Sequence, residues 1–165
     1  MSDIVSIELL LDPETEAQVR GEWDALASAG LSSLGAHTSP SNRPHVTLLV
    51  RSALPELAVG AALPIPVTLG APVLFGGGDR RVLARSVIPS PELMSLHASV
   101  RAAAGDGDDA PHTAPGEWMP HVTLARRLKL TDLETGLPLV GADIAGRGIA
   151  LRRWDAATAT VTEVY

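Results

Sequence analysis

The sequence predicts an α+β fold built from two similar halves related by a pseudo-two-fold axis. A five-residue segment, Pro44-His45-Val46-Thr47-Leu48, recurs unchanged at residues 120–124, nearly half of the 165-residue chain further on. A similar strand-helix-loop-strand pattern surrounds each copy. We therefore expect a bilobal domain, with two mainly antiparallel sheets around a central cleft and helices outside. It should span residues 1–165, with pseudo-repeat halves at about 1–78 and 79–165.

The first half of the chain is predicted to fold as strand, helix, loop and strand. Residues 4–11 are β-like and lead into Asp12-Pro13-Glu14. There Asp suits the N-cap, Pro suits the first helical position, and Glu lies near the positive end of the helix dipole. Apolar residues then recur at helical spacing until Gly30, a plausible stop. Residues 31–44 are predicted to form a loop, followed by a strand from His45 to about Arg51.

The second half repeats this order. Residues 82–88 are predicted as a strand, and Ser90-Pro91-Glu92 opens a helix in the same way as Asp12-Pro13-Glu14. That helix should end at Gly105. A proline-containing loop then leads to His121 and a strand that runs to about Leu128.

The remaining segments connect the two halves or complete the sheet. We predict a short helix at 54–63, a strand at 66–75 with a bend or bulge at Gly70-Ala71-Pro72, a glycine-rich turn at 76–79, and strands at 148–154 and 158–165 joined by a hairpin turn at Asp155-Ala156. Residues 131–140 fit either an irregular turn or a short helix.

Composition restricts the class of function. A hydrophobic content of 45% favours a folded globule, and the lack of cysteine excludes disulfides, thiolate nucleophiles and cysteine zinc sites. The start, Met1-Ser2-Asp3, has no basic segment before an apolar run, and no apolar stretch reaches the ~18 residues of a membrane span. We therefore expect a cytoplasmic, soluble protein with no membrane partner. A net charge of −6 disfavours binding of duplex DNA, but it is compatible with a small anionic substrate held by a few arginines.

The repeated segment carries acid/base chemistry. In a strand, alternate side chains share a face, so His and Thr of each copy point the same way, and Val and Leu point to the core. Two histidines across a cleft suit in-line displacement at phosphorus, one removing a proton from the attacking oxygen and the other protonating the leaving oxygen. Threonine hydroxyls can donate to the non-bridging phosphate oxygens. The candidate catalytic residues are His45, Thr47, His121 and Thr123.

No metal or cofactor is expected. The acidic segment at 106–109 does not have calcium-loop spacing, because Ala110 and Pro111 stand where a ligand and the turn glycine belong. A metal held by the two histidines is the remaining alternative, but threonines are poor substitutes for a third, carboxylate ligand.

Two His-x-Thr motifs at this separation resemble the two-histidine (2H) phosphoesterases, a superfamily with bacterial 2′-5′ RNA ligase-like proteins and cyclic nucleotide phosphodiesterases. The segment Pro120-His121-Val122-Thr123-Leu124-Ala125-Arg126 is similar to the second motif of the ligase-like branch. Phe75, the glycine-rich turn and the strand after it also resemble that branch. The resemblance implies a bilobal fold with both motifs in a central groove. It also implies metal-independent chemistry on 2′,3′-cyclic phosphates, ADP-ribose cyclic phosphate or 2′-5′ linked RNA, with His121 as base and His45 as acid in hydrolysis.

Candidate substrate-binding residues flank the motifs: Arg43, Phe75, Trp118 and Arg126. Strand alternation from the histidines places Arg51 and Arg127 on the motif face and Arg126 on the opposite face, although the resemblance favours Arg126. Twist near a strand end could bring either Arg126 or Arg127 to the groove. For each arginine, a solvated surface role is the alternative.

Aromatic and histidine side chains near the motifs have alternative roles. Trp118 could stack on a base or pack against the sheet. His97 is expected to be a buried core residue. His37 and His112 are expected to be loop residues that could line the mouth of the groove.

These observations predict a phosphoesterase that opens a cyclic phosphate on a small nucleotide or an RNA terminus, acting as a monomer. The alternatives are a 2′-5′ RNA ligase or phosphodiesterase, and a non-catalytic nucleotide- or RNA-binding module.

Overall fold

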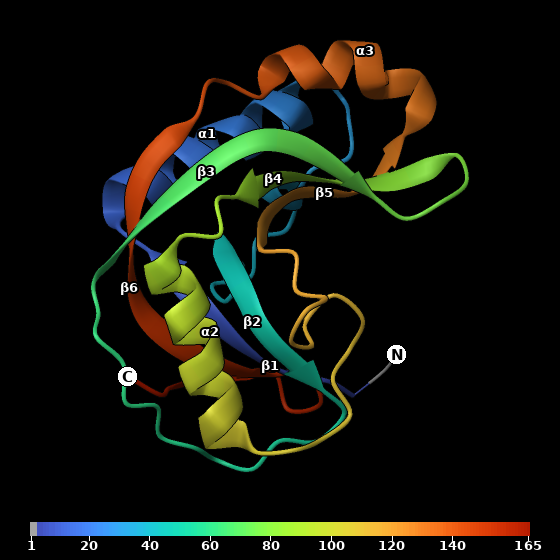
Figure 1. The fold of residues 1–165 in the computed structure, drawn as a ribbon. Coiled ribbons are helices and arrows are strands. Elements are labelled where there is room, and N and C mark those ends of the chain that lie inside the picture. Colours follow the sequence, from blue (N-terminus) through green and yellow to red (C-terminus); the bar gives the residue numbers. More distant parts are fainter. Residues whose placement is uncertain (1–2) are drawn as a thin grey trace.

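The structure is a computed structural model that describes residues 3–165 and has an α+β fold (Figure 1). Met1 and Ser2, part of the N-terminal segment used to predict location, lie outside the described residues. In the described chain, no helix has both the length and the apolar character needed to cross a membrane.

Strands and helices alternate much as the sequence predicts. The strands are β1 (Val5–Leu11), β2 (His45–Arg51), β3 (Ile65–Phe75), β4 (Arg80–Val87), β5 (His121–Lys129), β6 (Ile144–Asp155) and β7 (Thr160–Glu163). The helices are α1 (Pro13–Ser28), α2 (Pro91–Ala104) and the short α3 (Leu133–Gly136), with 3-10 turns at η1 (Leu34–Ala36), η2 (Leu130–Asp132) and η3 (Leu137–Leu139). The undecided segment 131–140 therefore forms a series of short helical turns.

The strands form one antiparallel sheet in the order β2-β1-β6-β3-β4-β5, with β7 paired to β6. This order follows the duplication, since β1, β2 and β3 of the first half correspond to β4, β5 and β6 of the second. The α+β class is confirmed, and the two expected sheets are the two wings of a single sheet. They are continuous because the long strand β6 pairs with β1 through one part of its length and with β3 through another.

The two long helices lie outside the sheet and are exchanged between the halves (Figure 1). Helix α1, from the first half, packs against β5 and β6, and α2, from the second, packs against β2 and β3. Both begin as the sequence predicts: Asp12 accepts a hydrogen bond from the backbone amide of Thr15 at 3.1 Å, and Ser90 accepts one from Leu93 at 3.2 Å.

The predicted helix at 54–63 is wrong, since this segment is irregular. Leu54 and Val59 are both buried in the core, and residues five apart lie roughly 140° apart around a helix, so one helical face could not bury both. The carbonyl of Leu54 also accepts a hydrogen bond from Arg153 at 2.7 Å. These tertiary contacts, together with the low stability of short isolated helices, favour the extended path.

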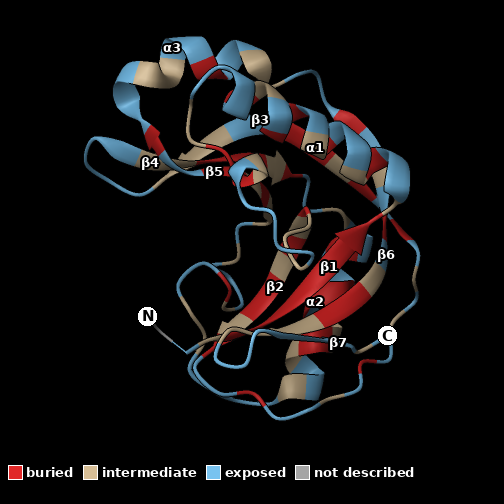
Figure 2. Cartoon of the chain, turned by 180° about the vertical axis from the view of Figure 1, so that it is seen from behind, coloured by how far each residue is buried: buried red, intermediate tan, exposed pale blue. Residues whose placement is uncertain are grey.

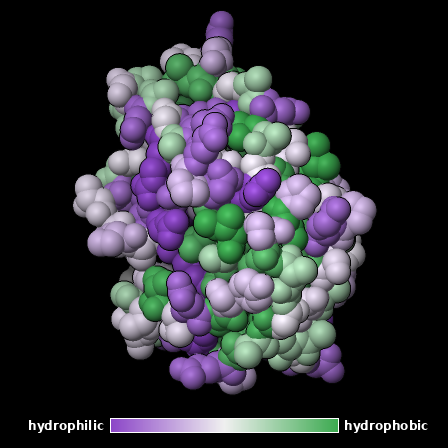
Figure 3. Space-filling view, turned by 90° about the vertical axis from the view of Figure 1, so that its left-hand side faces the viewer, coloured by the Kyte–Doolittle hydropathy of each residue, from purple (hydrophilic) through white to green (hydrophobic). Residues whose placement is uncertain are grey.

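Strand β1 is buried along its entire length (Figure 2). The side of the molecule that lies on the left in Figure 1 carries apolar and polar areas side by side (Figure 3). Because Ser6 and Glu8 of β1 are as buried as their aliphatic neighbours, their polar groups need partners inside the protein. One of those partners belongs to the site described next.

Candidate active site

The two repeated motifs lie close together because the sheet curls. Strands β2 and β5 stand at opposite ends of the strand order, yet they contact each other. His45 is the first residue of β2, and His121 is the first residue of β5. The curl therefore brings the starts of the two motif strands to one groove.

Both imidazoles are held in the same way by their own chain. Nδ1 of His45 lies 2.7 Å from the carbonyl oxygen of Arg43, and Nδ1 of His121 lies 2.7 Å from that of Met119. A carbonyl oxygen only accepts, so Nδ1 must carry the donated proton in each ring. Nε2 of each histidine is thereby left to exchange protons with another group.

The groove consists of two adjoining hollows that share Thr47. The larger, about 700 Å³, lies around His45, and most of the residues that line it are polar or charged, among them Glu8, His37, Ser41, Arg43, Arg126 and Arg152. The smaller, about 280 Å³, lies around His121 and is lined mainly by apolar groups, among them Phe75, Val82, Trp118 and Met119. Because Arg126 comes from β5 and His45 from β2, the larger hollow spans both halves.

Matching β-bulges follow the two motifs and decide which arginines reach the groove. Strand pairing passes from Thr47 to Leu49 opposite β1 and from Thr123 to Ala125 opposite β4, so Leu48 and Leu124 are extra residues. An extra residue shifts the alternation of faces by one position. Directly beyond each of these bulges, the side chains on the motif face are therefore those with the opposite parity. In β5 a second extra residue, between Ala125 and Leu128, then restores the original parity.

The shift corrects the expectation drawn from strand parity. Arg126 lines the groove, as the family resemblance favoured. Arg51 instead points into the protein, where it binds Asp109 at 2.9 Å and the carbonyl of Ala104 at 3.2 Å. Arg127 is exposed. The orientation expected for these arginines from strand parity was wrong, because sequence alone does not reveal a bulge between two strands.

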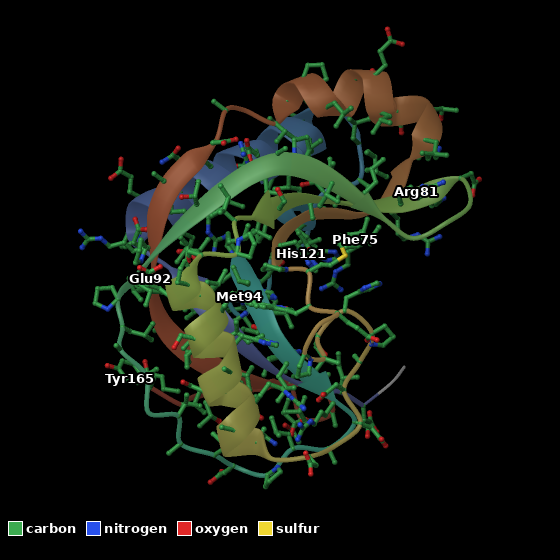
Figure 4. The ribbon with its side chains drawn as sticks, viewed as in Figure 1. Phe75, Arg81, Glu92, Met94, His121 and Tyr165 are labelled. Atoms are coloured by element: carbon green, nitrogen blue, oxygen red, sulfur yellow. The ribbon has the colours of Figure 1, made fainter. Side chains whose placement is uncertain are left out.

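Phe75 and Arg43 both lie at the groove, but they differ in whether they are free to contact a ligand. The ring of Phe75 lies 4.5 Å from the imidazole of His121, centroid to centroid, and the two residues are neighbours in Figure 4. Arg43 lines the larger hollow, but its Nε donates to Glu16 at 2.8 Å. Phe75 is thus available to contact a ligand beside His121, whereas the charge of Arg43 is already paired.

Trp118 packs within the protein and also lines the smaller hollow. Its indole stacks on His97 with a centroid distance of 4.0 Å, and its Nε1 donates to the carbonyl of Thr47 at 3.0 Å. In the other half, Nε1 of Trp23 donates to the carbonyl of Thr123 at 3.1 Å. Each motif threonine is therefore fixed through its backbone by an indole from the opposite half.

The outcome for the remaining sequence candidates varies. His37 lines the hollow around His45, and His112 lines the hollow around His121. His97 is buried, as expected, with Nε2 at 3.0 Å from the carbonyl of Thr113. Thr123 is half-buried in β5 two residues after His121, but it lines neither of the two hollows.

Sequence reasoning missed two groove residues, Glu8 and Arg152. Nε of Arg152 donates to Oε1 of Glu8 at 2.7 Å, and Oε2 of Glu8 lies 3.4 Å from Nε2 of His45. The signal was present, since a glutamate in the apolar run Val5–Leu11 is expected to be buried and paired.

The electrostatic surroundings of the groove act on two of its titratable groups. Burial raises the pKa of Glu8, but His45 and Arg152 outweigh it, so that the pKa lies below the ordinary 4.5. Burial, assisted by positive charge on His45 and His112, lowers the pKa of His121 below its ordinary 6.5, against the opposing hydrogen bond to Met119. Across residues 3–165, His, Asp and Glu side chains do not gather in threes to form a possible metal site.

A groove holding two His-x-Thr strands in a duplicated α+β fold defines a two-histidine type of protein. The chain belongs to the 2′-5′ RNA ligase superfamily, whose family model matches residues 13–165. The resemblance found in the sequence is therefore confirmed at the level of the family.

A solved structure supports the fold. Usb1 of Kluyveromyces marxianus superposes with a TM-score of 0.53 at 13% identity, covering 99% of this chain and 98% of that one. A structure of the same protein with uridine monophosphate gives a TM-score of 0.43 at 13% identity, with the same coverage. At this identity, likeness extends to the fold alone. No curated protein matches the chain.

Proposed function

We propose that this protein is a metal-independent phosphoesterase that opens a cyclic phosphate, on a 2′,3′-cyclic nucleotide, an RNA end or ADP-ribose cyclic phosphate. The observation that carries the proposal is the matched pair of imidazoles. Each is fixed through Nδ1 by the carbonyl two residues before it, leaving its Nε2 for proton exchange in one groove. Proton removal and proton donation at two points around one phosphorus require such a pair.

The reaction needs one proton taken up and one released. His121 removes a proton from water as the water oxygen bonds to phosphorus, and its lowered pKa keeps the ring neutral and able to accept. The bond from phosphorus to one ribose oxygen breaks, and His45 gives its Nε2 proton to that oxygen. The product is a phosphomonoester, and the two histidines return to their starting states by exchanging protons with solvent.

Other groove residues suit the charge and shape of such a substrate. Arg126 lies at the rim, and a guanidinium can donate two hydrogen bonds to phosphate oxygens. Thr47 lines both hollows, so its hydroxyl is a suitable group to orient the phosphate. Phe75 beside His121 offers an aromatic face against which a base can stack.

Two alternatives predict different products. A 2′-5′ RNA ligase or phosphodiesterase uses the same groups but forms or breaks a linkage between two nucleotides. A non-catalytic module would bind nucleotide or RNA and leave it unchanged. The two Nε2 atoms count against the module, because binding alone does not require two titratable groups with matched anchoring.

The test is a screen of the four 2′,3′-cyclic nucleotides, ADP-ribose cyclic phosphate and 2′-5′ dinucleotides, with product identification. We expect ring opening that survives chelator and follows a bell-shaped pH profile. Loss of activity on dialysis against chelator, restored by zinc, would contradict the metal-independent mechanism. Turnover of 2′-5′ dinucleotides alone would favour the ligase-like alternative, and binding without turnover would favour the module.

Substrate length can be tested separately. Given the net charge of −6, we expect contacts with one phosphate and its nucleoside rather than a long RNA track. The logarithm of affinity should then fall with the logarithm of salt at a slope of about −0.7 per phosphate contacted, for one or two phosphates. A steeper slope, with mononucleotides inert, would mean that RNA is the substrate.

A further inference from the structure

Glu8 occupies a position that links the candidate catalytic groups to a buried charge. In the sheet it lies directly between Thr47 of β2 and Arg152 of β6. Its side chain is 6% exposed. Its Oε1 accepts from Arg152 at 2.7 Å, while its Oε2 accepts from the Ser6 hydroxyl at 2.8 Å and faces Nε2 of His45 at 3.4 Å. The carboxylate thus approaches the nitrogen that the proposed reaction uses.

The equivalent row in the second half has no charge. Thr123 of β5 pairs with Ala84 of β4, and Ala84 pairs with Val73 of β3. Thr47–Glu8–Arg152 therefore corresponds to Thr123–Ala84–Val73. The strand pairing is equivalent in the two rows, but only the row beside His45 contains a carboxylate.

The charged groups around His45 leave Glu8 as the carboxylate that faces it. The groups that line its hollow from other elements are basic or neutral: Arg152 from β6, Arg126 from β5, and His37 and Arg43 from the loop before β2. Arg43 is paired with Glu16 of α1, and His121 acts on His45 from β5 as a like charge when both are protonated. Within the described residues, no other acidic side chain lies within ion-pair distance of His45.

We propose that Glu8 is a positioning residue that keeps the proton on Nε2 of His45, so that His45 enters the reaction as the acid and His121, which lacks such a partner, enters as the base. This inference rests on the proposed function for the meaning of acid and base, but the Glu8–His45 interaction itself exists without substrate. An imidazolium donates from both nitrogens, so His45 can bond the Arg43 carbonyl through Nδ1 and face Glu8 through Nε2 at once.

The interaction can be observed directly in the free protein by long-range ¹⁵N–¹H correlation spectra of the imidazoles between pH 5 and 8. At neutral pH in the unsubstituted protein, we expect Nε2 of His45, which faces the Glu8 carboxylate, to carry a proton and Nε2 of His121 to carry none. A bare Nε2 on His45 with a protonated Nε2 on His121 would overturn the proposal. This measurement needs neither a variant nor a substrate, so it decides the point even if no cyclic phosphate is turned over.

Two substitutions should move His45 in opposite directions. Glu8→Gln keeps a hydrogen-bonding side chain and removes the charge, and should lower the pH at which His45 titrates by about one unit. Arg152→Gln leaves the Glu8 charge less compensated and should raise the pH at which His45 titrates. His121 should move by less in both variants. An unchanged His45 titration in Glu8→Gln, or a shift of the same sign in both, would overturn the proposal.

A matched control is available elsewhere in the chain. Glu22 is also a buried carboxylate paired with an arginine: its Oε2 lies 2.6 Å from Nη2 of Arg85. Unlike Glu8, it lines neither hollow of the groove. Glu22→Gln should destabilise the protein in a similar way and leave both histidine titrations in place. If Glu22→Gln shifts His45 as Glu8→Gln does, the effect is one of general stability and the proposal fails.

Kinetics then test the assigned roles. In Glu8→Gln the high-pH limb of kcat/KM, where the acid loses its proton, should move down by about one unit, giving about tenfold lower activity above that limb. The low-pH limb, set by His121, should stay in place. A shift of the low-pH limb instead would reverse the roles of the two histidines. If the spectra behave as expected and no substrate is turned over, the proposed function fails while the Glu8–His45 interaction stands.

Discussion

The two halves of this molecule share their geometry and differ in their chemistry. Both begin the motif strand with histidine, fix Nδ1 on the carbonyl two residues before, and follow the motif with a bulge. The hollow around His45 is large and lined mainly by polar and charged residues, including a buried ion pair. The hollow around His121 is small and lined mainly by apolar residues, with Phe75 against the ring. Duplication therefore provides two imidazoles anchored in the same way, and the side chains around them make one different from the other.

The largest expected effect on kcat/KM comes from removing one histidine of the pair. His45→Ala and His121→Ala should each lower kcat/KM on the best cyclic phosphate by about 10²-fold or more, because each removes one of the two proton transfers. The double variant should be little worse than either single one, since the two groups act as a unit. Steady-state kinetics on folded variants, checked by circular dichroism, measure this. A single variant with near-normal rate would mean that the two imidazoles do not act together.

A smaller effect tests the bulge. Arg126→Gln should lower kcat/KM by roughly tenfold or more, the effect of losing a charge-assisted hydrogen bond of about 1.5–3 kcal/mol. Arg127→Gln is the matched control, because both arginines are exposed but only Arg126 lines the groove. We expect less than a twofold change there. Equal losses in the two variants would show that net charge, and not position after the bulge, governs binding.

The indole bonds that tie each half to the other should contribute about equally to stability. Trp118→Phe removes the donor to the Thr47 carbonyl, and Trp23→Phe removes the donor to the Thr123 carbonyl. Losing such a bond should lower the free energy of unfolding by about 1 kcal/mol in each variant, besides any packing change. Urea unfolding measures both. A much larger loss from one of them would mean that the two halves are not braced alike.

The smallest expected effect is on the free energy of unfolding as the pH falls. Burial lowers the pKa of both His97 and His121 below 6.5, and both residues come from the second half. The unfolded chain therefore takes up these protons first as the pH falls, so the stabilisation is complete above pH 6.5 and is lost below it. We expect the free energy of unfolding to fall between pH 7 and 5, and to fall less steeply in His97→Gln. A flat profile over this range would contradict the shifts.

The sequence predicts the repeated unit well because its signals are local. The Asp12 and Ser90 caps, the strands beginning at His45 and His121, and the glycine-rich turn all follow from a few adjacent residues. The helix at 54–63 was wrong because burial of Leu54 and Val59 is decided by contacts with distant segments. Local propensity does not contain that information.

In the site, sequence identifies the motif residues and misses what depends on strand pairing. The orientation of Arg51 and Arg126 follows from bulges that only the partner strands reveal. Glu8 meets His45 because β1 pairs with β2, and it meets Arg152 because β1 also pairs with β6. A charged residue in an otherwise apolar strand indicates that a buried partner exists, but the sequence does not identify that partner.

The exchange of helices between the halves restricts how the groove can move. A hinge opening would have to pull α1 away from β5 and α2 away from β2 at the same time, and would also break the hydrogen bond between Trp23 and the Thr123 carbonyl. We therefore expect the interlocked halves to resist changes in the separation of the two histidines. Changes in groove width are left to the loops at 31–44 and 105–120, which supply its rims on either side. If the proposed function holds, we therefore expect access of substrate and escape of product to depend on motion of these loops rather than on closure of domains.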